Sequence, residues 1–131
     1  MSADAYHMTA PHPEGLGAYL VMKNCLEDAG LSANDVDHIN MHGTSTPLGD
    51  IAESNAISRL MGEHAFDTQI KSTKSITGSL MGAAGGVEAL SARQTIMHDF
   101  ISTTINPFID DERIVSRLNF TRNHAVKKTV Y

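Results

Sequence analysis

Two glycine-containing segments constrain the fold of this chain more than any other feature. The segment HGTSTPLGD begins at His42, and KSTKSITGSLMGAAGG runs from Lys71 to Gly86. Each follows a short stretch with the pattern of a strand and leads into a helical pattern. Strand, turn and helix in this order are the units of an α/β fold, in which ligands bind at the carboxyl ends of the strands. The two segments therefore predict a common site.

The remaining periodicity predicts an alternation of helices and strands along the whole chain. Helices are expected over 14–29, 47–61 and about 80–98, strands over 36–41, about 68–73 and 125–131, an extended segment over 101–109, and loops over 1–13 and 110–124. This order predicts a single α/β domain over residues 1–131, with a mixed, mostly parallel sheet and helices on both faces.

Helical spacing also predicts which side chains are buried. The expected apolar faces consist of Ala18, Val21, Met22, Cys25 and Ala29 in the first helix, Leu48, Ile51, Ala52, Leu60 and Met61 in the second, and Ala83, Val87, Leu90 and Met97 in the third. Gly30 and Gly62 are expected to end the first two helices. Thr46 is expected to cap the second helix, with Pro47 at its first position.

Charge and composition argue against several classes of protein. A net charge of −5, from 15 acidic and 10 basic residues, disfavours a general nucleic-acid binder. No apolar run approaches the roughly 18 residues of a membrane span, and residues 1–13 lack the pattern of a secretion signal. The single cysteine, Cys25, excludes an internal disulfide framework and favours a cytoplasmic protein. His7 and His12 have no further metal ligand at suitable spacing, so a zinc site is not expected.

Four polar residues in the two segments, and Glu88 just after the second, are candidates for chemistry, and each has a simpler structural explanation. His42 ends a predicted strand and could act on a ligand or only close the loop. Thr44 and Thr46 could bind an amide-rich ligand, although capping alone explains Thr46. Lys74 could be directed at a carboxylate or be solvated. Glu88 could orient a catalytic group or simply be stabilised by the helix dipole.

In their order and spacing, HGTSTPLGD and STKSITGSLMGAAGGVEA resemble the β-ketoacyl-ACP synthases, the condensing enzymes of fatty-acid elongation, and most closely the type II elongating enzyme. The resemblance extends over nearly the whole chain, including GVEAL and TINPF. It implies a thiolase-like fold of two related α/β halves. This chain would be most of the carboxyl-terminal half, incomplete at both ends, and should expose sheet edges.

The resemblance also implies residue roles and partners. His42 would be the first catalytic histidine, Lys74 the active-site lysine and Glu88 the acid that pairs with it, while Thr44 and Thr46 would line the phosphopantetheine tunnel. The implied reaction is a decarboxylative Claisen condensation of an acyl thioester with malonyl-ACP, without a metal or organic cofactor of the enzyme. The implied partners are acyl carrier protein, an amino-terminal half and a second copy of the chain.

Two departures from the family pattern predict that this chain alone is inactive. The nucleophilic cysteine of the family lies in the amino-terminal half, and Cys25 does not match its motif. Ser79 occupies the position of the second catalytic histidine, in TGS instead of TGH. The alternative interpretation is a non-catalytic partner, such as an ACP-binding or chain-length subunit.

Overall fold

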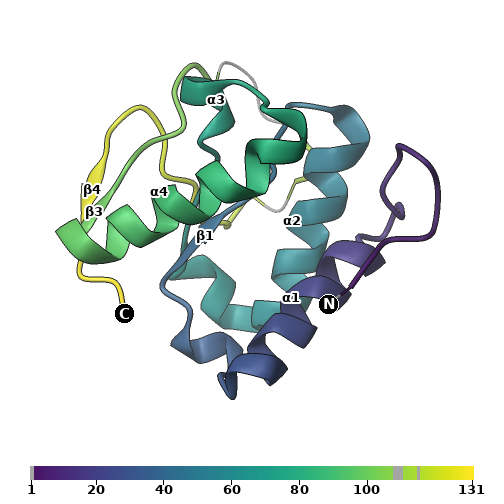
Figure 1. The fold of residues 1–131 in the computed structure, drawn as a ribbon, viewed down its shortest axis with the longest axis horizontal. Helices are drawn as coiled ribbons and strands as arrows, with labels where there is room; N and C mark the ends of the chain where they lie inside the picture. The colour runs from purple at the N-terminus through teal and green to yellow at the C-terminus, as the bar shows by residue number, and fades with distance from the viewer. Residues whose placement is uncertain (1, 108–110, 115) are drawn as a thin grey trace.

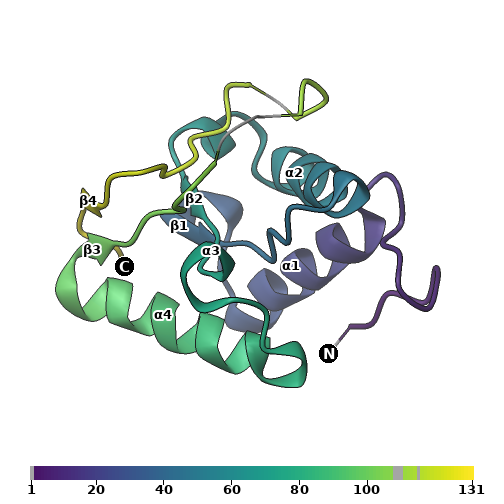
Figure 2. The same cartoon turned by 90° about the horizontal axis from the view of Figure 1, so that it is seen from above.

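The computed structural model describes residues 2–107, 111–114 and 116–131. Its helices are α1 (Leu16–Ala29), α2 (Pro47–Met61), α3 (Lys74–Thr77) and α4 (Ala84–His98), and its strands are β1 (His38–Asn40), β2 (Gln69–Lys71), β3 (Phe100–Ile101) and β4 (Val126–Lys127). Short 3-10 turns cover Ala33–Asp35, Gly62–Phe66 and Met81–Ala83. Helices α1 and α2 lie side by side, and the β1–β2 pair lies between them and α4 (Figures 1 and 2).

The predicted order of elements is confirmed up to α4, but the described residues form two separate two-stranded sheets instead of the one mostly parallel sheet that was predicted. Strands β1 and β2 pair in parallel with Ile39 opposite Ile70, whereas β3 and β4 form a separate antiparallel pair. Side-chain hydroxyls form further hydrogen bonds next to the β1–β2 pair. The hydroxyl of Thr68 donates to the carbonyl of Val36, and the N–H of Ser72 donates to the hydroxyl of Thr104.

The starts and ends of the helices show where local sequence signals were sufficient for the prediction. Gly30 and Gly62 follow α1 and α2 with φ of 67° and 57°, so both predicted ends are confirmed. Helix α2 begins at Pro47, with Thr46 in the cap position, yet Thr46 makes no side-chain cap bond. The third predicted helix begins at Ala84 rather than Leu80, after a 3-10 turn. Residues 108–110 and 115, within the predicted 101–109 and 110–124 segments, lie outside the described residues.

The buried core lies between α2 and the β1–β2 pair. It consists of Met41, Ile57, Met61, Ala65, Ile70 and Leu118. In α2 the predicted burial is confirmed for Ala52 and Met61 and wrong for Leu48, which is exposed. The sequence prediction missed Ile57, which is fully buried.

The predicted apolar faces of α1 and α4 are only partly confirmed: Met22 of α1 packs against the core, and Ala18 and Val87 are half-buried. Helix α1 has no buried residue, and Cys25 is exposed. In α4, Leu90 and Met97 are 62% and 55% exposed. Helix α4 contacts the β1–β2 pair through polar side chains, such as Ser91. The periodicity of apolar residues therefore indicates the solvent-facing side of α4 instead of its buried side.

A polar layer separates α4 from β1 and β2. The buried Lys71 side chain, in a residue that is 1% exposed, donates to the hydroxyls of Ser91 at 3.0 Å and Ser102 at 2.6 Å. It forms no ion pair with a carboxylate among the described residues. Burial lowers the pKa of Lys71. Burial, together with the positive charges of Lys71 and Lys128, lowers the pKa of His38 to about 4. Holding Lys71 charged here therefore costs free energy.

We expect Lys71→Met to raise the free energy of unfolding at neutral pH by about 1–2 kcal/mol, because an incompletely paired buried charge is removed. The pKa of Lys71 is lower in the folded chain than its usual 10.5, so between these two pKa values the unfolded state binds more protons and stability rises with pH. The advantage of the variant should therefore shrink as the pH approaches 10.5 in a series of urea unfolding curves. A constant difference across this range would contradict the assignment.

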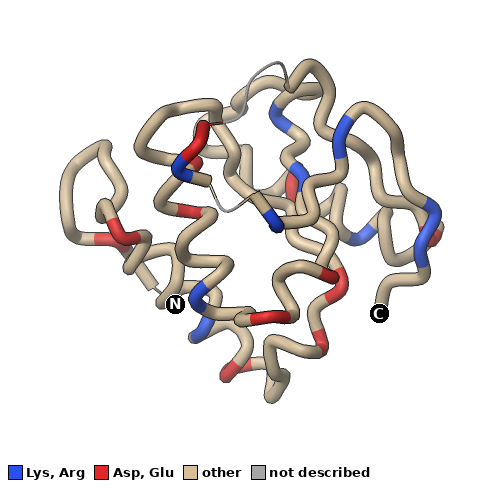
Figure 3. Tube along the Cα trace, turned by 180° about the vertical axis from the view of Figure 1, so that it is seen from behind, with Lys and Arg blue, Asp and Glu red and all other residues tan. Residues whose placement is uncertain are grey.

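Charged residues of both signs occur along the chain, partly in runs of one sign. Residues 27–53 include six acidic and no basic residues, and residues 113–128 include five basic and no acidic residues. Figure 3 marks the charged positions on the trace of the chain. Among the described residues, no helix is both long enough and apolar enough to span a bilayer.

Candidate functional site

The loop after β1 places His42 next to a glycine that the backbone requires. Gly43 has a φ of 44°, and a Cβ added there would lie 2.6 Å from the Cβ of Ser72. A side chain at this position is disfavoured both by the left-handed conformation and by the missing space. The two glycine-containing segments of the sequence are thereby brought into direct contact, as predicted.

A carboxylate on α2 holds this loop by its backbone. The N–H groups of His42 and Gly43 donate to Oε1 and Oε2 of Glu53, at 2.6 Å and 3.0 Å. Burial raises the pKa of Glu53, and these two bonds oppose the shift. Burial likewise raises the pKa of Asp50, whose Oδ1 is buried without a hydrogen-bond partner among the described residues. The sequence analysis missed the role of Glu53, although acids three residues apart on the helix after the loop were a usable signal.

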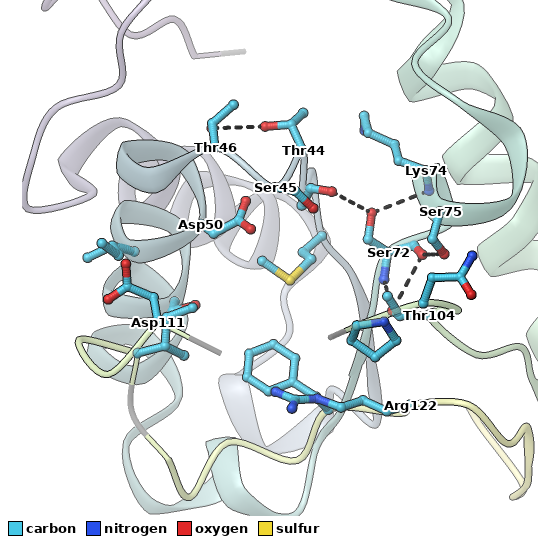
Figure 4. A pocket seen from close by; sticks show the side chains of 18 of the residues that line it. Thr44, Ser45, Thr46, Asp50, Ser72, Lys74, Ser75, Thr104, Asp111 and Arg122 are labelled. Atoms are coloured by element: carbon cyan, nitrogen blue, oxygen red, sulfur yellow. Dashed lines mark hydrogen bonds between the residues drawn. The ribbon is translucent and has the colours of Figure 1, made fainter. Parts of the chain in front are cut away.

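Ser72 connects the two segments at their closest approach. Its hydroxyl donates to the carbonyls of His42 at 3.3 Å and Gly43 at 3.2 Å, and accepts from the N–H of Lys74 at 3.4 Å. Figure 4 shows Ser72 between the loop of Thr44 and the side chain of Lys74. Sequence reasoning did not single out this serine, because a hydroxyl between two polar neighbours gives no distinct pattern.

Lys74 and Glu88 form an ion pair. The sequence left open whether Lys74 faces a carboxylate or solvent, and whether Glu88 orients a catalytic group or only interacts with the helix dipole. The Lys74 ammonium donates to Oε1 of Glu88, and the two side chains are only 7% and 19% exposed. Lys74 is the first residue of α3, which replaces part of the predicted loop, and Glu88 lies in the second turn of α4. A buried pair of this kind fixes the position of the ammonium group.

A pocket of about 670 Å³ opens between these segments and the chain after Thr104 (Figure 4). Of the predicted site residues, Thr44, Thr46, Lys74 and Ser79 line it, whereas His42 and Glu88 do not. The hydroxyls of Thr44 and Thr46 lie 3.1 Å apart in a mutual hydrogen bond. Apolar side chains share the lining, including Ile51, Ile105, Pro107 and Phe120. Such a lining suits a long ligand with alternating polar and apolar groups.

Comparison with known proteins identifies the family. Residues 1–107 match the family described as beta-ketoacyl synthase, C-terminal domain. The chain belongs to this family. The family resemblance inferred from the two segments is therefore confirmed, and the β-ketoacyl synthases related to this chain are condensing enzymes of fatty-acid synthesis.

Curated β-ketoacyl synthases match this chain over part of their length. The 3-oxoacyl-[acyl-carrier-protein] synthase 2 of Synechocystis is 46% identical over 106 residues, which are 81% of this chain and 26% of that protein. The synthase 2 of Coxiella burnetii is 46% identical over 125 residues, 95% of this chain and 30% of that protein. The chain thus spans less than a third of the length of these relatives.

Solved β-ketoacyl synthase structures resemble the fold closely. The AntDE:AntF structure, a type II PKS acyl-carrier protein in complex with its ketosynthase bound to the hexaketide, matches with a TM-score of 0.90 and 33% identity, over 99% of this chain and 31% of that one. The ishigamide ketosynthase/chain length factor matches with a TM-score of 0.88 and 35% identity, over 98% and 30%. The fold is accordingly that of a thiolase-like β-ketoacyl synthase C-terminal domain, present as a fragment with helices and small sheets.

Proposed function

We propose that this chain supplies the carboxyl-terminal part of the condensing site of a 3-oxoacyl-ACP synthase, and that it is inactive alone. The main support is the juxtaposition of the buried Lys74–Glu88 pair with a pocket lined by Thr44 and Thr46. In this proposal the two threonine hydroxyls bind the amide groups of the phosphopantetheine arm carried by acyl carrier protein. The apolar side chains of the pocket lining accommodate the methylene groups of the same arm.

The proposed reaction needs groups from both halves of a complete synthase. A cysteine thiolate of an amino-terminal half would hold the acyl group as a thioester. Malonyl-ACP would lose carbon dioxide, and the resulting enolate would attack that thioester and expel the thiolate. His42 would donate a hydrogen bond to the thioester oxygen on which negative charge develops. Lys74, fixed by Glu88, would hold the malonyl carboxylate by its charge until the carboxylate leaves as carbon dioxide.

A second candidate function is a non-catalytic, ACP-binding or chain-length partner of a condensing enzyme. Ser79 favours it, because a serine lines the pocket at the position of the family's second catalytic histidine. One of the similar solved structures is also a ketosynthase/chain length factor pair. Both candidates require the pantetheine arm to bind, and they differ only in whether chemistry follows.

Binding of acyl carrier protein tests what the two candidates share. We expect the chain to bind holo-ACP, which carries the pantetheine arm, more tightly than apo-ACP in calorimetric titrations. Thr44→Val and Thr46→Val should each weaken holo-ACP binding by about 3- to 10-fold, the value of one neutral hydrogen bond, and leave apo-ACP binding unchanged.

Thr77→Val is the matched control, because Thr77 lies on α3 and is outside the pocket lining. It should bind holo-ACP like the parent chain. Equal affinity of the parent chain for holo-ACP and apo-ACP, with no effect of the two pocket substitutions, would overturn the proposed function in both forms.

A further inference from the structure

The side chain of Asn40 bonds to two other segments of the candidate site at once. Its Oδ1 accepts from the N–H of Thr73 at 3.2 Å, and its Nδ2 donates to the hydroxyl of Thr73 at 3.4 Å and to the backbone carbonyl of Glu88 at 3.3 Å. Asn40 is the last residue of β1 and half-buried. Both amide hydrogens and the amide oxygen are therefore in use.

These contacts join the three segments that hold the proposed catalytic groups. Asn40 precedes His42 by two residues, Thr73 directly precedes Lys74, and the carbonyl that accepts the third bond belongs to Glu88 itself. Asn40 does not line the pocket. Its bonds end on the backbone or hydroxyl of its partners, so they can set where these segments lie without touching a ligand.

We propose that Asn40 is a positioning residue, which ties the strand before His42 to the start of α3 and to α4 and so sets the distance between Lys74 and the loop of His42. The assignment deepens the proposed condensing function and rests on it. It specifies asparagine rather than aspartate, because the carbonyl of Glu88 requires a donor and the N–H of Thr73 requires an acceptor. No other small side chain offers both in one plane.

The first test uses the isolated chain and needs no activity. Asn40→Ala should increase hydrogen exchange of the Thr73 amide and shift the ¹³C resonances of the Lys74 side chain and the Glu88 carboxylate. Asn40→Asp keeps the volume and the acceptor, loses the donors and adds a negative charge next to the Glu88 carbonyl, so it should leave Thr73 protected and still shift the Glu88 resonance. Asn55→Ala, at a half-buried asparagine of α2 outside the pocket lining, is the control and should shift neither.

The second test measures kinetics in the chain joined to an amino-terminal half and containing Ser79→His. Asn40→Ala and Asn40→Asp should lower kcat by about 10- to 100-fold, as expected for a small displacement of reacting groups, with KM for malonyl-ACP changed less than about twofold. A purely structural role would lower stability and leave kcat of the folded fraction unchanged.

The outcomes separate this inference from the function on which it rests. Unchanged Lys74 and Glu88 resonances in folded Asn40→Asp, or an unchanged kcat with a raised KM, would overturn the positioning role. If Asn40→Ala does not fold, Asn40→Asp alone decides in the same way. Inactivity of the joined enzyme with Asn40 intact would count against the proposed function, and the resonance shifts would still decide the role of Asn40.

Discussion

Replacing Ser79 by histidine, in this chain joined to the amino-terminal half of a β-ketoacyl synthase, is expected to raise the rate of malonyl-ACP decarboxylation by about a hundred- to a thousandfold. A serine side chain is short and remains neutral, so it cannot stabilise the enolate oxygen as a histidine can. One donor directed at a developing oxyanion contributes about 3–4 kcal/mol, which corresponds to this change in rate. Ser79 already lines the pocket, so the new imidazole would project from a suitable position.

Release of carbon dioxide from labelled malonyl-ACP measures this effect. Ser75→His is the matched control, because Ser75 lines the same pocket and the histidine would be displaced from the family's position. It should leave the rate near that of the parent. A joined protein with Ser79→His that binds holo-ACP and remains as slow as the parent would contradict the enzymatic interpretation and favour the non-catalytic partner.

The second large effect concerns stability. Glu88→Ala should lower the free energy of unfolding by about 3–5 kcal/mol, because it leaves the Lys74 ammonium buried without its carboxylate. Urea unfolding at neutral pH measures this loss. The double variant Lys74→Met/Glu88→Leu removes both charges and should be clearly more stable than Glu88→Ala, since no charge is left uncompensated.

An exposed ion pair in the same chain supplies the comparison. Lys23 and Glu27 lie one turn apart on α1 at 3.4 Å, with both side chains largely in solvent. Glu27→Ala should therefore cost only about 0.5 kcal/mol or less. Equal losses in Glu27→Ala and Glu88→Ala would show that the Lys74–Glu88 pair is solvated in solution and does not fix the lysine.

The features that could be predicted from the sequence depend on short-range signals. Gly30 and Gly62 end their helices, and Pro47 begins α2, because each conformation depends mainly on the residue itself. The contact between the two glycine-containing segments was also predictable, since consecutive parallel strands bring their carboxyl ends together.

The features that could not be predicted depend on which surfaces meet in three dimensions. Periodicity indicated Leu90 as buried, but α4 contacts β1 and β2 through polar residues such as Ser91, so the apolar face points outward. The role of Ser72 could not be predicted either, because its hydroxyl bonds to backbone groups, which every sequence contains. The role of Asn40 could not be predicted for the same reason, since it bonds to the backbone of Thr73 and Glu88.

The Glu53 carboxylate of α2 also determines how a ligand would meet this site. Glu53 already binds the backbone N–H groups of His42 and Gly43 without any ligand. Binding would then require little further ordering of the protein, and the entropy lost would come mainly from the flexible arm of the ligand. Association should accordingly proceed in one kinetic step, at a rate set by the encounter of the two molecules rather than by closure of a loop.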